Sequence, residues 1–506
     1  MAPTYLRQLL AVLTEQVDKI EGLAEKKGLP GYPSLDELPD AKQDEFTTDP
    51  EVVQAAYLAT SAASQLAATL KPSGLQAYER AAAYYQSTAM RIVSEACVPE
   101  ILREAGPQGL HVKDIAAYTG TNVKVLSRAL RCLCTNYVFK EVRFVLFYPI
   151  NVSPLTGYQT YQLSPDVFAH NRPSAVVDTQ KPVDLVVKHA IEKKKTIDAY
   201  PHGVSAVHGE RYQDTNGILA VLDHNTDEMY KGAAYMADNV LADNYKKAPV
   251  STAFQTDDEI WKWMERYPGF LQRIQMVMMG WTSLYPHKKN MNGFDWAALP
   301  KDALVVDVGT GVGTEAERIA RKGPQLKVIG QDRAQTIDEV AIPRWKADPS
   351  LKPMFESGRV RLEAHSFFDD QPAHVAQHAA VFYLRYITHD WPLEENLKIL
   401  KKLHAAAAPD TLLVLAEQVV PYACPAPSSL VFEGMNSLNP PAPLLPNLGQ
   451  AFSEVYLMDL TMAVLANGQE RTIGELKEMT EAAGWQIVRI HQTPGCCFGE
   501  IVCKKI

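Results

Sequence analysis

The chain has 506 residues, which is enough for two to four domains. A hydrophobic content of 46% and a charged content of 22% are ordinary for a globular protein, and the net charge of −9 disfavours a general role at nucleic-acid or membrane surfaces. The seven cysteines are scattered without a C-x-x-C pair, and the sequence shows neither a signal peptide nor an apolar run of about 18 residues. We therefore expect a reduced, cytoplasmic protein.

Residues 1–105 are predicted to form an N-terminal helical region. Apolar residues at helical spacing indicate a helix over residues 5–28, ended by Gly28 and Pro30. Two further helices are predicted over residues 52–70 and 74–96, both rich in alanine and leucine. Because they are too apolar for a lone surface layer, we expect them to bury a face in a homodimer. The alternative is that they pack only on their own chain.

Residues 106–180 are predicted to form a winged-helix domain. His111 to Glu141 show a helix, a Thr-Gly-Thr turn, a second helix and a β-leaning tail. A DNA-reading helix needs several phosphate-binding cations, but the second helix carries only Lys124, Arg128 and Arg131. We therefore expect a structural, dimer-forming winged helix and no nucleic-acid partner.

Residues 142–162 are anomalous within this domain. The segment is apolar and aromatic, and it carries no charge after Arg143, where a wing loop should be polar. Codons for Val142-Arg143 can read as a fungal 5′ splice site, and codons for Leu155-Thr156 can contain a branch point. Codons for Tyr-Gln at 158–159 or 161–162 can end in CAG. We interpret residues 142–162 as a possible retained intron; the alternative is a genuine hydrophobic insertion.

Residues 181–300 are predicted to be a helical linker that contributes to a substrate pocket. The helix over residues 270–283 carries Met276, Met278 and Met279, and methionine adapts well to flat apolar ligands. We expect Met278 to contact a substrate. Such a stripe at helical spacing is equally consistent with a plain core.

The stretch LVVDVGTGVGTEAERIARKGPQLKVIGQD from Leu304 to Asp332 predicts the start of an α/β sheet. A strand, a glycine-rich turn, a helix, a second strand and a terminal acid form the first half of a nucleotide-binding fold. Gly309 and Gly311 let the backbone pass close to a ligand, and Asp332 can accept hydrogen bonds from ribose hydroxyls. A glycine-rich turn without a ligand is the alternative. With Asp307 opening it, the turn resembles motif I of S-adenosylmethionine (SAM) methyltransferases.

The sheet pattern continues to the C-terminus. Further strands are predicted over residues 360–363, 379–386 and 411–417, and a final hairpin over residues 485–491 and 498–504. Ligands in such sheets bind beyond the carboxyl ends of the strands, where His389 and Glu417 are predicted to lie beside Asp332. Histidine suits the removal of a phenolic proton, and a carboxylate from Glu417 or Glu470 would orient it. The alternative for His389 is a structural histidine at a strand end.

The run FYLRYITHDWPLEENLKILKKLHAAAAPDTLLVLAEQVV resembles the core of caffeic-acid-type plant and fungal O-methyltransferases, most closely the fungal branch. This resemblance covers residue 50 to the C-terminus apart from residues 142–162. In that family the histidine of H-D-W is the general base, here His389. Two glutamates flank it, here Glu417 in VLAE and Glu470 in GQERT.

The resemblance implies a class I Rossmann-like catalytic domain over residues 301–506, behind an all-α and winged-helix dimerisation region. It also implies that Gly309 and its turn hold the methionine part of SAM, that Asp332 holds the ribose, and that Arg385 is the basic cofactor contact. Ser366 departs from the family, which has an acid before the two aromatic residues that begin here with Phe367. We expect this change to weaken the adenine contact. No metal is expected, because the sequence has no cluster with metal-ligand spacing.

The expected activity is SAM-dependent methylation of a phenolic or enolic hydroxyl in secondary metabolism, on an aromatic or polyketide-like small molecule. We expect Asp390 and Asp459 to contact this acceptor, in addition to Met278. One alternative keeps the fold but performs a pericyclic or dehydration step with SAM bound only as a positive charge. A second alternative is a non-catalytic regulator that uses the winged helix.

Overall fold

The computed structural model describes residues 3–142, 144–146, 162–196, 209–242, 247–258, 260–284, 293–435, 440–492 and 497–506. The chain forms two compact units. The sheet unit comprises Met1–Val17, Val53–Ala67 and Asn290–Ile506, and the helical unit comprises Asp18–Val52 and Ala68–Lys289. None of the described helices is both long and apolar enough to cross a bilayer.

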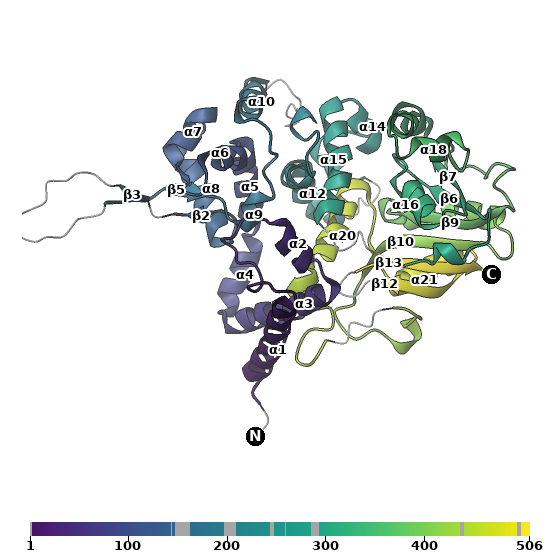
Figure 1. The fold of residues 1–506 in the computed structure, drawn as a ribbon, viewed down its shortest axis with the longest axis horizontal. Coiled ribbons are helices and arrows are strands. Elements are labelled where there is room, and N and C mark those ends of the chain that lie inside the picture. The colour runs from purple at the N-terminus through teal and green to yellow at the C-terminus, as the bar shows by residue number, and fades with distance from the viewer. Residues whose placement is uncertain are drawn as a thin grey trace, which may run out of the picture. The chain divides into compact units, whose positions relative to one another are not determined.

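The sheet unit is built on one mixed sheet with the strand order β12-β13-β10-β9-β6-β7-β8 (Figure 1). Its strands are β6 (Leu304–Val308), β7 (Lys327–Asp332), β8 (Val360–Ala364), β9 (Ala379–Arg385), β10 (Leu412–Val420), β12 (Trp485–Gln492) and β13 (Phe498–Lys505). Strands β6 to β10 run parallel to one another, whereas β13 is antiparallel to β10 and β12. The short strand β11 (Arg471–Thr472) pairs with the end of β10. The α/β fold and the final hairpin predicted from the sequence are thereby confirmed.

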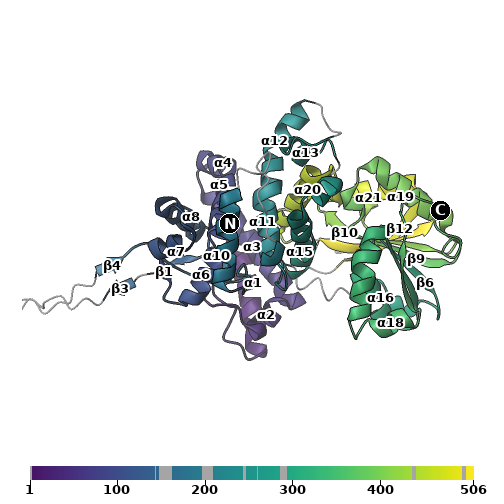
Figure 2. The same cartoon turned by 90° about the horizontal axis from the view of Figure 1, so that it is seen from above.

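Helices cover both faces of this sheet (Figure 2). Neighbouring side chains of a strand point to opposite faces, so Val305 packs with one helical layer and Val306 with the other. The first layer consists of α16 (Thr314–Lys322), the π-helical turn η7 (Thr336–Ala341), α17 (Ile342–Ala347) and α18 (Lys352–Glu356). The second consists of α19 (Leu393–Ala406) and α21 (Ile473–Ala482).

A smaller apolar cluster joins the N-terminal helices to the rest of the sheet unit. Leu9 of α1 (Tyr5–Lys26) and Ala62 of α3 (Pro50–Leu70) are fully buried in it, together with Phe452. Phe452 immediately precedes α20 (Ser453–Ala466). These faces of α1 and α3 therefore pack on their own chain.

The helical unit contains the remaining helices and two small sheets. Its helices are α2 (Ala41–Thr47), α4 (Ser73–Ala81), α5 (Tyr84–Glu95), α6 (Val98–Ala105), α7 (Val112–Thr119), α8 (Val123–Thr135), α9 (Arg172–Ala175), α10 (Val183–Thr196), α11 (Ile218–His224), α12 (Tyr230–Leu241), α13 (Pro249–Ala253), α14 (Ile260–Glu265) and α15 (Pro268–Leu284). Strands β1 (Leu110–His111), β5 (Val167–Ala169) and β2 (Lys140–Glu141) form one sheet, and β3 (Phe144–Leu146) pairs with β4 (Gln162–Ser164). Residues 147–161, most of the anomalous segment, lie outside the described residues.

The single helix predicted over residues 74–96 is wrong, because the structure divides it into α4 and α5. Ala82 leaves the helical conformation, with φ −94° and ψ 2°. Alanine favours helices, so its composition gave no stop signal. A π-helical turn, η4 (Asn225–Met229), also interrupts the passage from α11 to α12.

Candidate active site

His389 lies in a short 3₁₀ turn, η8 (Thr388–Asp390), just beyond the carboxyl end of β9. Its Nδ1 is 2.7 Å from Oε1 of Glu470, whose side chain is completely buried. Its Nε2 is 3.5 Å from Oδ1 of Asp390. Burial alone would lower the pKa of His389, but the carboxylates of Glu470 and Asp390 raise it to about 10. The neighbouring carboxylates therefore favour the protonated form of the imidazole.

Glu417 has a different task from Glu470, although the sequence left open which of them orients the histidine. It projects from β10, and its Oε1 accepts hydrogen bonds from the Ile387 N–H at 3.2 Å and from the Thr388 N–H and hydroxyl, both at 2.8 Å. Burial raises the pKa of Glu417 to about 7. Glu417 thus secures the turn that carries His389, while Glu470 contacts the imidazole itself.

The carbonyl oxygen of Thr388 is fixed from the opposite direction. It accepts hydrogen bonds from Nη1 of Arg471 at 2.6 Å and from Nδ2 of Asn396 at 2.8 Å. Both donors are buried side chains. The turn is therefore held through its backbone as well as its side chains, as the preorganisation of a catalytic base requires.

His389, Glu417 and Glu470 offer atoms within 4.8 Å of one another, a spacing that could also accommodate a metal ion. The sequence showed no cluster with metal-ligand spacing, but the fold brings these three distant residues together. Nδ1 of His389 bonds Glu470 within this group, and Oε1 of Glu417 bonds the Thr388 turn, whereas Oε2 of each glutamate has no hydrogen-bond partner among the described residues. This pattern favours a hydrogen-bonded acid–base group.

The glycine turn follows β6 and has the left-handed backbone that favours glycine, with φ +77° at Gly309 and +56° at Gly311. A Cβ at Gly309 would lie 2.3 Å from Cδ1 of Ile387. A Cβ at Gly311 would meet no atom within 4 Å, so the turn opens onto free space. Oδ2 of Asp332 accepts the Gly311 N–H at 2.8 Å, which brings this carboxylate to the turn. The arrangement fits a cofactor with a ribose.

Two predicted cofactor residues have protein partners instead. Asp307 is buried beneath the turn, where it accepts a hydrogen bond from the Thr310 hydroxyl, and burial raises its pKa to about 7. Arg385 is ion-paired with Glu315 of α16, and its guanidinium lies 5.3 Å from the centre of the Tyr386 ring. Both side chains thus support the glycine turn and strand β9 from within the protein.

Ser366 and Phe367 lie just beyond β8. The His365 N–H donates to the Asp332 carbonyl at 2.8 Å, which brings this segment beside the ribose candidate. The Ser366 hydroxyl is exposed and accepts the Phe368 N–H at 3.3 Å. The Phe367 ring is partly buried, 5.8 Å from the Trp391 ring. A hydroxyl and an aromatic ring are therefore available for a nucleobase.

The three predicted acceptor contacts differ in position. Asp390 adjoins Nε2 of His389, and burial raises its pKa. Asp459 of α20 instead accepts the Glu470 N–H at 3.0 Å, so it holds the backbone of the glutamate that contacts His389. Met278 lies on α15 of the helical unit and is 55% exposed.

Sequence reasoning missed Tyr386, the first residue after β9. Its ring centre is 5.1 Å from that of the His389 imidazole, and the two planes are inclined by 32°. Its φ of +51° is rare for a bulky residue. The only available signal was its position between a strand and the H-D-W motif.

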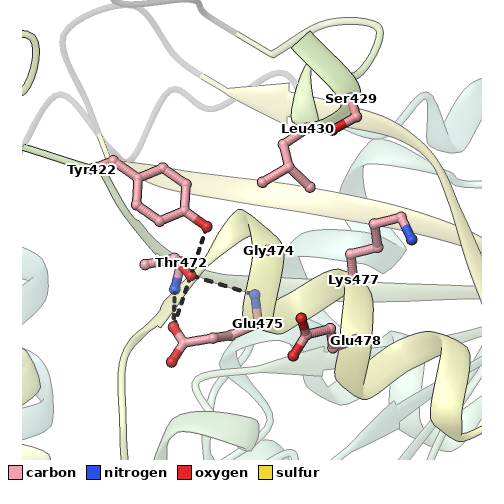
Figure 3. A pocket seen from close by; sticks show the side chains of 8 residues that line it. All are labelled: Tyr422, Ser429, Leu430, Thr472, Gly474, Glu475, Lys477 and Glu478. Carbon is pink, nitrogen blue, oxygen red and sulfur yellow. Dashed lines mark hydrogen bonds between the residues drawn. The ribbon is translucent and has the colours of Figure 1, made fainter. Parts of the chain in front are cut away.

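A separate cavity of about 550 Å³ lies at the N-terminus of α21 (Figure 3). It is lined by Tyr422, Ser429, Leu430, Thr472, Gly474, Glu475, Lys477 and Glu478. Thr472 caps the helix together with Glu475 and also accepts the Tyr422 hydroxyl at 3.2 Å. These polar groups satisfy one another, so this cavity does not add to the site around His389.

The sequence matches known O-methyltransferases. An O-methyltransferase domain model matches residues 234–439. The 4-O-methyltransferase 1 of Phanerochaete chrysosporium is 33% identical over 499 residues, covering 97% of this chain and 96% of its own.

Two solved structures share the fold at low sequence identity. Human N-acetylserotonin methyltransferase in complex with SAM has a TM-score of 0.56 and 15% identity, and the match covers 86% of this chain and 98% of that one. A pericyclic reaction enzyme has a TM-score of 0.60 and 15% identity, with coverage of 99% and 100%.

Proposed function

The chain belongs to the O-methyltransferase family and has its α/β fold with SAM as methyl donor, and from this premise we propose that it methylates a phenolic or enolic hydroxyl of an aromatic or polyketide-like small molecule. The contact between Nδ1 of His389 and Glu470 carries the proposal. With Nδ1 occupied, Nε2 is the nitrogen that takes the acceptor proton. His389 is the general base.

The chemistry requires the acceptor oxygen to be ionised as it attacks. When bound, SAM would supply an electrophilic methyl group on a sulfonium and would leave as S-adenosylhomocysteine, while Nε2 of His389 takes the proton of the acceptor hydroxyl. The raised pKa of His389, about 10, is close to that of an ordinary phenol, also about 10. Proton transfer between the two groups is therefore nearly balanced, and because the base must be neutral to accept this proton, the rate should rise as the pH approaches that pKa.

Other residues of the sheet unit would bind SAM and the acceptor. Gly309 and Gly311 would hold the methionine part of SAM, Asp332 the ribose, and Ser366 with Phe367 the adenine. The free space at Gly311 and the nearby carboxylate of Asp332 support this assignment. Asp390, beside Nε2 of His389, would contact the acceptor.

A second candidate keeps SAM as a bound positive charge and catalyses a pericyclic or dehydration step. The similarity in fold to a pericyclic reaction enzyme favours it. The contact of Nδ1 of His389 with Glu470 favours methyl transfer, because it leaves Nε2 to take the proton of an acceptor hydroxyl, a step that a pericyclic rearrangement does not need.

We also propose that the protein is a cytoplasmic homodimer whose helical and winged-helix regions assemble rather than read DNA. Helix α4 buries none of its own residues, and Leu75, Tyr78 and Tyr85 are about half exposed or more. Arg131 is paired with Glu141 and Asp166, so it is not free for phosphate. Light scattering of the wild type and of Tyr78→Glu tests this; a monomeric wild type would contradict it.

Residues 142–162 remain a proposed retained intron. Sequencing of the spliced transcript decides the matter, because a message that contains these codons would show a genuine insertion.

The function is tested by incubating the protein with methyl-labelled SAM and a panel of small phenols and enols. Label should appear on an acceptor oxygen, with one S-adenosylhomocysteine formed per product. Binding of SAM without its consumption by any acceptor would reject methyl transfer and favour the pericyclic alternative.

A further inference from the structure

A run of five residues, Arg385 to His389, links the glycine turn to the proposed base, His389. Four of its side chains are anchored on separate partners: Arg385 on Glu315, Ile387 against Gly309, Thr388 on Glu417 and His389 on Glu470. The side chain of Tyr386 lies on the base itself, with its ring centre 5.1 Å from that of the imidazole.

Tyr386 is held firmly in this position. Its N–H donates to the Ala416 carbonyl at 3.1 Å, and its hydroxyl accepts a hydrogen bond from Nε2 of Gln418 at 3.4 Å. Its ring also packs on Phe498, at 5.1 Å between centres. A non-glycine residue with φ +51° is strained, and such strain persists where the surroundings determine the conformation. Strand β10 thus carries both Glu417 and the two hydrogen-bond partners of Tyr386, Ala416 and Gln418.

The contact bears on how His389 is oriented. Glu470, Asp390 and Glu417 are the acidic groups that raise its pKa, and the first of these binds one end of the ring. A single hydrogen bond at Nδ1 fixes one atom but leaves the imidazole free to tilt about it. An aromatic face inclined by 32° restricts that tilt and favours the cationic form of the imidazole.

We propose that Tyr386 is a positioning residue: its ring fixes the plane of the His389 imidazole, so that Nε2 faces the acceptor hydroxyl while Nδ1 stays on Glu470. This inference rests on the proposed function. The phenol hydroxyl of Tyr386 is secondary, since the contact is made by the ring. The left-handed backbone serves to bring the ring back over a histidine three residues later.

Three substitutions separate the ring from the hydroxyl and from the backbone. Tyr386→Phe removes only the hydroxyl and should keep kcat within about twofold. Tyr386→Leu keeps apolar bulk without a π face, and Tyr386→Gly removes the side chain while accepting a positive φ. Both should lower kcat on the order of 10- to 100-fold, as a small misplacement of a reacting group does. The Kd for SAM, measured by calorimetry, should stay within about threefold.

The readout that a purely structural role would not move is the titration of His389. NMR of histidine-labelled protein, with His389→Asn to assign the signal, should show the pKa of His389 lowered by about half a unit in Tyr386→Leu and Tyr386→Gly, and unchanged in Tyr386→Phe. A wild-type kcat in Tyr386→Leu would overturn the proposal. A wild-type kcat in Tyr386→Gly with a lowered kcat in Tyr386→Leu would also overturn it, because the backbone conformation and not the ring would then matter. If the wild type transfers no methyl group, the proposed function fails; an unchanged His389 titration in both ringless variants would then reject the ring's role independently.

Discussion

The two units each bury a cluster of charges, and the clusters are balanced differently. In the helical unit, Arg273 is 1% exposed and pairs with Glu228 and with Asp227, the latter at 3.4 Å. Asp227 also pairs with Arg91 at 2.8 Å and with Lys231 at 2.7 Å. Burial would raise the pKa of Asp227 and of Glu228, but Arg273 lowers both.

The cluster of the sheet unit has more acids than cations. Glu470, Asp390 and Glu417 gather around a single imidazole, and burial raises the pKa of both Asp390 and Glu417. Both clusters include buried atoms without a hydrogen-bond partner among the described residues, such as Oε2 of Glu417 and Oε2 of Glu228, so the clusters differ in the balance of their charges. A balanced cluster fixes its charges, whereas an unbalanced one holds protons that can move. The difference is the one that the proposed catalytic role of His389 requires.

The largest expected effect is on the stability of the helical unit. Arg273→Met should reduce the free energy of unfolding by about 3–5 kcal/mol, because it leaves Glu228 and Asp227 buried without this partner. Urea unfolding followed by far-UV circular dichroism and by tryptophan fluorescence measures it. Arg266→Met, which removes an exposed ion pair with Asp258, is the matched control and should cost at most about 1 kcal/mol. Equal effects of the two variants would contradict the comparison.

The second prediction concerns pH. The base must be neutral to act, so kcat/KM of the wild type should rise with pH toward about 10, the pKa of His389. The same raised pKa means that the pairing stabilises the fold below pH 6.5 and that this stabilisation is lost as the pH rises through about 10.

Glu470→Gln should move that rise in kcat/KM to lower pH, because the neutral amide no longer favours the imidazolium. It should also lower kcat by about 10²-fold through loss of orientation. Steady-state rates across pH 6–10 provide the test; a profile identical to that of the wild type would show that Glu470 does not govern the base.

The sequence predicted the parts of the site that depend on short motifs and strand order. The glycine turn, Asp332 and His389 lie at the carboxyl ends of their strands, where the strand pattern placed them, and Glu470, which the family resemblance indicated, contacts His389. The partners of Arg385 and Asp307 could not be predicted, because a motif indicates the type of a residue but not the direction of its side chain. The separate tasks of Glu417 and Asp459 depend on hydrogen bonds between distant segments.

The smallest expected effect is that of an acid at position 366, because this position is exposed and a carboxylate there would not be buried. Ser366→Asp restores the acid that the family has at this position and should lower the Kd for SAM about threefold to tenfold, through a charge-assisted hydrogen bond. Calorimetry measures the change, with Ser366→Asn as the uncharged control. No gain in affinity would show that adenine is recognised elsewhere.

The central claim is that His389 is catalytic and not structural. The direct test compares His389→Asn with the wild type for both kcat and the free energy of unfolding, because asparagine can still donate to Glu470 but cannot act as the base. The account predicts that kcat falls by about 10²–10⁴-fold while stability changes by less than about 1.5 kcal/mol. Unchanged kcat, or a loss of stability like that of Arg273→Met, would contradict it.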